Sequence, residues 1–132
     1  MSNEFDPDRG WFPITTDISS HLPFSAAVEA NGFVFVSGQA SVDAAGNIVP
    51  GSFEEQMRRA LQNVTDILRS AGLGLENVVR VTSYVQDPSD LPVFNQLYRE
   101  YFTAPYPART TITSCLSAVI TFEIDVIAVR PS

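Results

Sequence analysis

Arg109 is the residue whose type and setting most clearly suggest chemistry. It opens an uncharged segment, Thr110 to Thr113, with the composition of a strand. Because alternate residues of a strand share a face, Arg109 and Thr111 are expected on the same side. A guanidinium is a planar fork that matches a carboxylate with two hydrogen bonds. The residues alone leave two interpretations open: a carboxylate-binding site, or an ion pair at the end of a sheet.

Glu123 is the second candidate and lies in another alternating segment. Glu123 and Asp125 fall on one face of this segment, and the other face is apolar: Phe122, Ile124, Val126 and Ala128. A partly buried carboxylate in such a place can polarise water as a general base. The same pattern also fits an edge charge that pairs with Arg80 or Arg130.

Most familiar catalytic motifs are missing from the sequence. It contains no Gly-rich phosphate loop, no Gly-x-Ser-x-Gly turn and no Cys/His cluster, so neither a cofactor nor a metal is expected. Ser37-Gly38 resembles a nucleophile turn, but a serine triad needs a positioned histidine, and the single histidine, His21, lies in an irregular segment. Cys115, the single cysteine, is expected to be a buried and unreactive thiol.

Composition and charge limit the class of protein. The 132 residues are 45% hydrophobic and 17% charged, which fits one folded domain. The net charge of -7 disfavours nucleic acid as a partner. The first residues are polar and acidic, unlike a signal peptide, and no apolar run reaches the length of a membrane span. We therefore expect a cytoplasmic protein.

The pattern of elements predicts an α+β domain with a mixed sheet of about six strands and two helices on one face. Residues 1–22 form an irregular arm with a short edge strand near Trp11, and residues 23–132 form the domain. Ser52 and Glu55 make a capping box, and Asn31-Gly32 is typical of a tight hairpin turn. Strands are expected over 25–30, 32–39, 78–85, 109–115 and 121–129, and helices over 52–72 and 87–101.

The strand that contains Phe33 to Val36 is apolar on both faces. Two helices can cover only one face of such a sheet, so the other face must bury itself against something else. A second copy of the same chain is the simplest partner. Self-association is therefore expected from the pattern alone.

Several motifs together resemble the Rid family, the YjgF-like reactive-intermediate deaminases. The resemblance covers roughly residues 21 to 130, and any one motif is weak by itself. They are Pro23-Phe24-Ser25-x-Ala27, Val34-Phe35-Val36-Ser37-Gly38-Gln39, Asn95-x-x-Tyr98-x-x-Tyr101-Phe102, Pro107-Ala108-Arg109-Thr110 and Phe122-Glu123-Ile124-Asp125-x-Ile127-Ala128. The resemblance implies a chorismate-mutase-like subunit and a homotrimer with three clefts between subunits.

The resemblance also implies roles for individual residues. Arg109 matches the arginine that binds the substrate carboxylate, and Glu123 matches the glutamate near the reactive water. Ser37, Gly38 and Asn95 match residues at or behind the cleft. The chain departs from the family at two wall positions, where Phe24 replaces a frequent tyrosine and Thr111 a frequent cysteine.

The function implied is hydrolysis of a 2-imino acid or its enamine tautomer to a 2-keto acid and ammonia, without a cofactor. One alternative is a non-catalytic or chaperone-like trimer that binds small carboxylates, and another is a deaminase of a larger aminated acid. An endoribonuclease is a further alternative that the negative charge disfavours.

RNA incubated with the purified protein is expected to stay intact, because a chain with a net charge of -7 repels phosphate. Electrophoresis of an end-labelled RNA measures this. Cleavage that co-purifies with the protein and disappears in Arg109→Ala would contradict the prediction.

Overall fold

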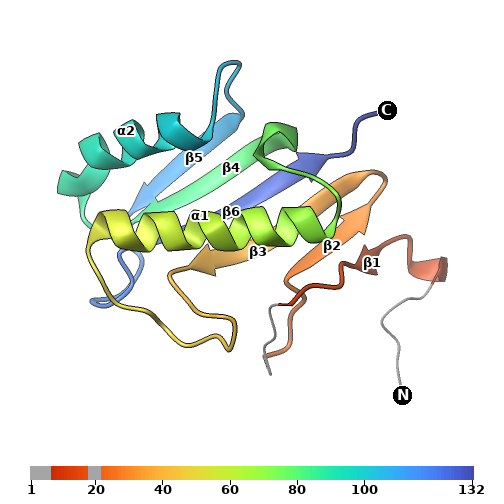
Figure 1. Ribbon diagram of the computed structural model, residues 1–132, viewed down its shortest axis with the longest axis horizontal. Coiled ribbons are helices and arrows are strands. Elements are labelled where there is room, and N and C mark those ends of the chain that lie inside the picture. The colour runs from red at the N-terminus through yellow and green to blue at the C-terminus, as the bar shows by residue number, and fades with distance from the viewer. Residues whose placement is uncertain (1–6, 18–21) are drawn as a thin grey trace.

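A computed structural model describes residues 7–17 and 22–132 as an α+β fold (Figure 1). Its six-stranded sheet has the order β1-β2-β3-β6-β4-β5, in which β4 and β5 are parallel and all other neighbours are antiparallel. The strands are β1 (Phe12–Pro13), β2 (Ala27–Ala30), β3 (Phe33–Ala40), β4 (Val78–Val85), β5 (Ala108–Thr113) and β6 (Phe122–Val129). The helices are α1 (Phe53–Ser70) and α2 (Leu91–Tyr101), with short 3-10 helices at Pro7–Arg9, Leu75–Asn77 and Pro88–Asp90.

Local signals fix the ends of these elements as expected. The Ser52 hydroxyl accepts from the Glu55 amide at 3.1 Å, and the Glu55 carboxylate accepts from the Ser52 amide at 2.8 Å, which completes the capping box of α1. Asn31 and Gly32 both have positive φ, 52° and 81°, so the β2–β3 hairpin has the predicted tight turn.

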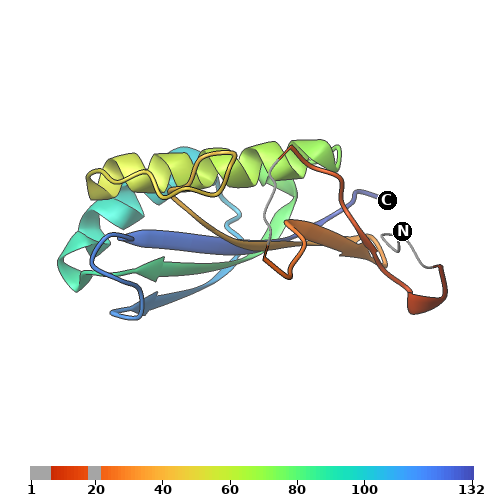
Figure 2. The same cartoon turned by 90° about the horizontal axis from the view of Figure 1, so that it is seen from below.

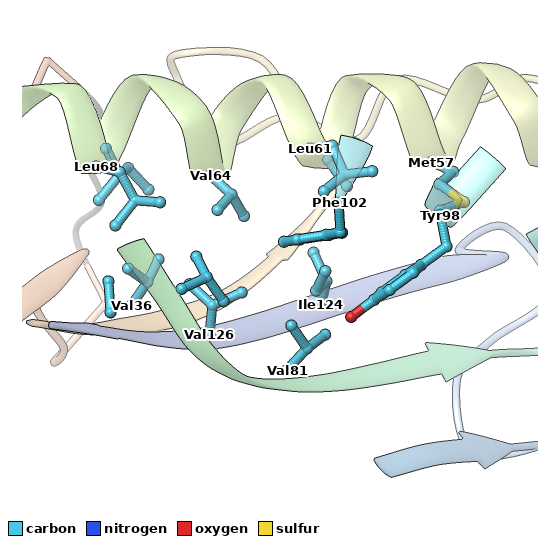
Figure 3. Packing of buried hydrophobic residues seen from close by; sticks show 14 of the residues in the cluster. Val36, Met57, Leu61, Val64, Leu68, Val81, Tyr98, Phe102, Ile124 and Val126 are labelled. Atoms are coloured by element: carbon cyan, nitrogen blue, oxygen red, sulfur yellow. The ribbon is translucent and has the colours of Figure 1, made fainter. Parts of the chain in front are cut away.

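Both helices lie on the same face of the sheet (Figure 2). The core forms between the two layers. Figure 3 shows side chains of α1 pointing at the strands, with Leu61 and Leu68 among them, and side chains such as Val36 and Ile124 meeting them from the sheet. The alternation of β6 decides which of its residues take part, because every second residue from Phe122 is buried.

The other face of the sheet has no helix over it and carries apolar side chains. Phe33 and Phe35 are each 41% exposed there. Val34 and Val36, which alternate with them along β3, point to the other face and are buried under α1. Ile112 of the edge strand β5 is also exposed. The prediction of a strand that is apolar on both faces is therefore confirmed, and this second face is called the open face below.

One sequence-based expectation is wrong. Cys115 is exposed, because β5 ends at Thr113 and Ser114 takes a positive φ of 65°, which turns the chain out of the sheet before the cysteine.

The N-terminal segment is described only in part. The short edge strand near Trp11 is present as β1. His21 lies outside the described residues, and the division into an arm of residues 1–22 and a domain of residues 23–132 stays a prediction. Within residues 7–17 and 22–132, no helix is both long and apolar enough to cross a membrane.

Candidate active site

Arg109 lies near the start of β5, at the edge of the sheet. It is in register with Val81 of β4, whose side chain is fully buried under the helices. Arg109 therefore points to the helix side, where its guanidinium carbon is 4.8 Å from the centre of the Tyr98 ring and 5.0 Å from that of Phe94. Both rings belong to α2, so the helix presents an aromatic surface to a cation, an arrangement that stabilises the charge without using any N–H donor.

Among the residues that the structure describes, the side chain of Arg109 makes no hydrogen bond and no ion pair. The ion pairs of the described chain use Arg58, Arg69 and Arg130 instead. The alternative of an ion pair at the sheet end thus finds no partner here. The donors of Arg109 remain available for a ligand.

Tyr98 is held firmly beneath this guanidinium. It stacks on Phe102 with ring centres 4.5 Å apart, lies 6.4 Å from the ring of Tyr106, and is only 4% exposed. Burial raises the pKa of the Tyr98 phenol, and the nearby Arg109 charge opposes that rise. Because the Tyr98 ring is fixed, the guanidinium of Arg109 that lies on it has a defined position.

A cavity of about 230 Å³ opens beside these rings. Its lining is Asn95, Tyr98, Arg99, Tyr106, Pro107 and Arg109. Asn95, expected near the cleft, thus lies with Arg109. Thr111 follows on the same face of β5, and its buried hydroxyl has no hydrogen-bond partner among the described residues.

Glu123 lies on the open face, in register with Tyr84 of β4 and Ala40 of β3. The β3 ladder has a bulge between Val36 and Gln39, and Gly38 within it lies directly over the glutamate. A methyl group added at Gly38 would overlap the Glu123 carboxylate. A larger residue at position 38 would therefore force the Glu123 carboxylate to move, so the two positions are in direct contact.

The carboxylate of Glu123 has no cationic partner among the described residues. Arg80 donates to Thr110, and Arg130 pairs with Glu29 at 2.7 Å, so neither of the expected arginines reaches it. Burial raises the pKa of Glu123, and the negative charge of Asp125 raises it further. The result is a half-buried acid that keeps its proton to higher pH than an exposed glutamate does.

Asp125 and Tyr84 form a fixed polar pair beside Glu123. The Tyr84 hydroxyl donates to Asp125 at 2.9 Å. Burial, followed by this hydrogen bond, raises the pKa of Tyr84 to about 12. Tyr84 thus stays protonated and donates to Asp125, whereas the Glu123 carboxylate has no such hydrogen bond among the described residues.

Phe24 and Ser37 lie together along a second hollow on the side of the open face. The Ser37 hydroxyl donates to the Ser25 carbonyl at 2.6 Å, and this hydrogen bond ties β3 to the segment that precedes β2. Phe24 is 54% exposed and lies with Ser37 along this hollow of about 520 Å³, which Phe35 also borders. This wall is apolar except for Ser25 and Ser37.

The expected site residues therefore form two groups on opposite faces of the sheet. Asn95, Arg109 and Thr111 lie on the helix side at the β5 edge, and are called the arginine group. Phe24, Ser37, Gly38 and Glu123 lie with the open face, and are called the glutamate group. One chain does not bring the two groups together, because Arg109 is in register with buried Val81 and Glu123 with Tyr84, which point to opposite faces.

Sequence reasoning missed three participants. Phe94 and Tyr98 were expected as part of the buried stripe of α2, which they are, but nothing in their spacing indicated that they would lie under an arginine. Arg99 was not singled out, although its position four residues after Asn95 places both on one side of the helix.

Comparison with known proteins gives the family. The model described as endoribonuclease L-PSP matches residues 14–130. The mitochondrial protein mmf2 of Schizosaccharomyces pombe is 41% identical over 76% of this chain and 79% of its own length. The mouse 2-iminobutanoate/2-iminopropanoate deaminase is 36% identical over 82% of each chain. The Rid-family protein YyfA of Yersinia pestis superposes with a TM-score of 0.84 at 30% identity, over 91% of this chain and 99% of its own.

The chain belongs to the Rid family, whose sequence model carries the endoribonuclease L-PSP description. The predicted resemblance and the predicted α+β fold are both confirmed. At the level of the family, the mouse relative supports an imine deaminase, while the family description names a ribonuclease. The cytoplasmic location stays a prediction, since the fission yeast relative is named as mitochondrial.

Glu123→Gln is expected to gain stability relative to the parent protein as the pH rises. The pKa of Glu123 is raised in the folded chain, so the folded state holds its proton to higher pH than the unfolded state does. The stability that this group contributes at low pH is therefore lost as the pH rises through the folded pKa, and glutamine removes that loss. Thermal melts between about pH 4 and pH 8 measure the difference.

The exposed Glu76→Gln serves as the control and should show no such trend. A Glu123→Gln variant that is destabilised equally at every pH would show that the glutamate stabilises the fold in a way unrelated to its titration.

Proposed function

We propose that this chain is a hydrolytic deaminase that converts 2-imino acids, or their enamine tautomers, to 2-keto acids and ammonia without a cofactor. The observation that carries the proposal is the unpaired guanidinium of Arg109, which lies on two aromatic rings beside a cavity of about 230 Å³. A planar fork with free donors suits the carboxylate of such a substrate. The deaminase name of the mouse relative supports the same chemistry.

The active unit is a homotrimer, with each site between two copies of the chain. Three observations support this. The arginine and glutamate groups face opposite sides of one sheet. The open face leaves Phe33, Phe35 and Ile112 exposed, as expected for a surface that a second copy covers. The arginine group lies at β5, the edge strand, where a neighbour can reach it.

Substrate binding begins with the carboxylate on Arg109. The two-point contact fixes the position of the adjacent C=N carbon, and the Phe94 and Tyr98 rings prevent the guanidinium from turning away. Thr111 extends the same face with a hydroxyl in place of the family's frequent cysteine.

Hydrolysis follows at the C=N carbon. Glu123 of the neighbouring copy removes a proton from water as the water oxygen bonds to that carbon, and the imine nitrogen takes up a proton. The resulting carbinolamine then loses ammonia as its hydroxyl proton leaves, which forms the keto C=O bond. The raised pKa of Glu123 makes it a stronger base than an exposed glutamate, which suits it to accept and return this proton. Imines hydrolyse unaided in water, so positioning and one shared proton are enough to accelerate the reaction.

A non-catalytic trimer that binds small carboxylates is the second candidate. Phe24 favours it, because this exposed ring offers no hydroxyl where many family deaminases have tyrosine. Both candidates use Arg109, and they differ in whether Glu123 exchanges a proton.

Arg109→Ala is expected to lower kcat/KM for 2-iminobutanoate about ten- to a hundredfold, the effect of losing one charge-assisted contact. Arg109→Lys should not restore the rate, because lysine keeps the charge but loses the planar fork. Imine formed in situ, with the spontaneous rate subtracted, gives the turnover, while light scattering and thermal melts report assembly and stability.

Arg69→Ala is the matched control. Arg69 lies on α1 in an exposed ion pair with Asp66, so its loss should leave turnover unchanged. Full turnover in Arg109→Ala would contradict the proposed function. Lost turnover together with a broken trimer would show a structural role instead of a binding role.

A further inference from the structure

The cavity beside Arg109 contains a second arginine that the proposed reaction does not use. Arg99 lies on α2 one turn after Asn95 and lines the same cavity. The one side-chain hydrogen bond of Arg99 among the described residues is a long one, 3.4 Å, to the Asn95 carbonyl of its own helix. The ion pairs of the described chain do not include it.

The surroundings of Arg99 explain why its charge is not neutralised. Glu100, the next residue, pairs with Arg58 of α1 at 3.0 Å. The remaining lining of the cavity is aromatic, amide or proline, and includes no acidic side chain. Two arginines thus share a hollow of about 230 Å³ in a chain whose net charge is -7. A local positive field of this kind attracts anions against the charge of the whole protein.

We propose that Arg99 is a second anion-binding residue of this cavity, and that the substrate class is a 2-imino acid with a second acidic group, of the type of 2-iminoglutarate. This inference rests on the proposed function. Arg109 holds the carboxylate next to the imine carbon, and Arg99 holds the distal carboxylate. The Tyr98 and Tyr106 rings in the lining cover the aliphatic part of the chain between the two carboxylates.

The geometry makes Arg99 a specificity residue and gives it no part in the bond-breaking step. Both arginines are exposed, but Arg109 rests on the α2 rings and holds the carboxylate next to the imine carbon. Arg99 contacts only the distal carboxylate in this arrangement. Its removal should therefore alter the choice between substrates and leave the reaction on a monocarboxylate intact. An exposed charge contributes modestly and is screened by salt.

The test compares two imino acids of equal chain length. An amino acid oxidase with catalase forms 2-iminoglutarate from glutamate and 2-iminopentanoate from norvaline. We expect the native protein to prefer 2-iminoglutarate, and Arg99→Gln to lower kcat/KM for it about three- to tenfold while leaving 2-iminopentanoate unchanged. The preference should shrink in about 0.5 M salt. Arg59→Gln, an exposed arginine on α1, removes the same charge elsewhere and should change neither rate.

The outcomes separate this inference from the proposed function. Equal rates on both substrates in the native protein, no effect of Arg99→Gln, or an equal loss on both substrates would each overturn the role of Arg99 while deamination itself stands. If the native protein accelerates neither imine, the proposed function fails and calorimetry decides the inference. Tighter binding of 2-oxoglutarate than of 2-oxopentanoate, lost in Arg99→Gln, supports it, and equal binding of the two keto acids overturns it.

Discussion

A guanidinium that lies on aromatic rings without an acidic partner is the interaction on which the whole site depends. A cation over a ring gains about 0.5–1 kcal/mol at an exposed position, which is less than a strong ion pair offers. Within the part of the chain that the structure describes, it leaves all five N–H donors of the Arg109 side chain unused. The stack of Tyr98 on Phe102 keeps the platform rigid, so the free donors have a defined direction. An acidic side chain in that place would have stabilised the fold and occupied the site.

The alternation of the sheet is the second constraint, and it shapes the assembly. Register with β4 sends Arg109 to the helix side and Glu123 to the open face, and no rotamer change moves a side chain through a sheet. An enzyme that needs both groups on one substrate must therefore use two copies of the chain. The exposed Phe33 and Phe35 give a reason for those copies to associate. In this way a single feature of strand geometry links the chemistry to self-association.

Sequence patterns correctly predicted the features that depend on residues close together in the chain. The capping box of α1, the Asn31-Gly32 turn and the two-faced β6 strand each depend on residues a few positions apart, and all three were correctly expected. Such patterns could not predict the register between strands that are far apart in the sequence. The overlap of Gly38 with Glu123 depends on a bulge in β3, and the rings under Arg109 depend on β5 pairing in parallel with β4. Cys115 was misplaced because a single positive φ at Ser114 ends the strand early.

The most direct test of a site shared between copies is complementation between two inactive variants. Arg109→Ala and Glu123→Gln, co-expressed with different tags and purified as mixed trimers, place an intact Arg109 from one copy opposite an intact Glu123 from another. Each mixed trimer, whichever variant it holds twice, has one intact site of three, so imine turnover should return to roughly a third of the native rate. Each variant alone should stay well below this level, at about a tenth of the native rate or less for Arg109→Ala. Mixed trimers that stay as inactive as their parents would contradict a site built from the arginine group of one copy and the glutamate group of the next.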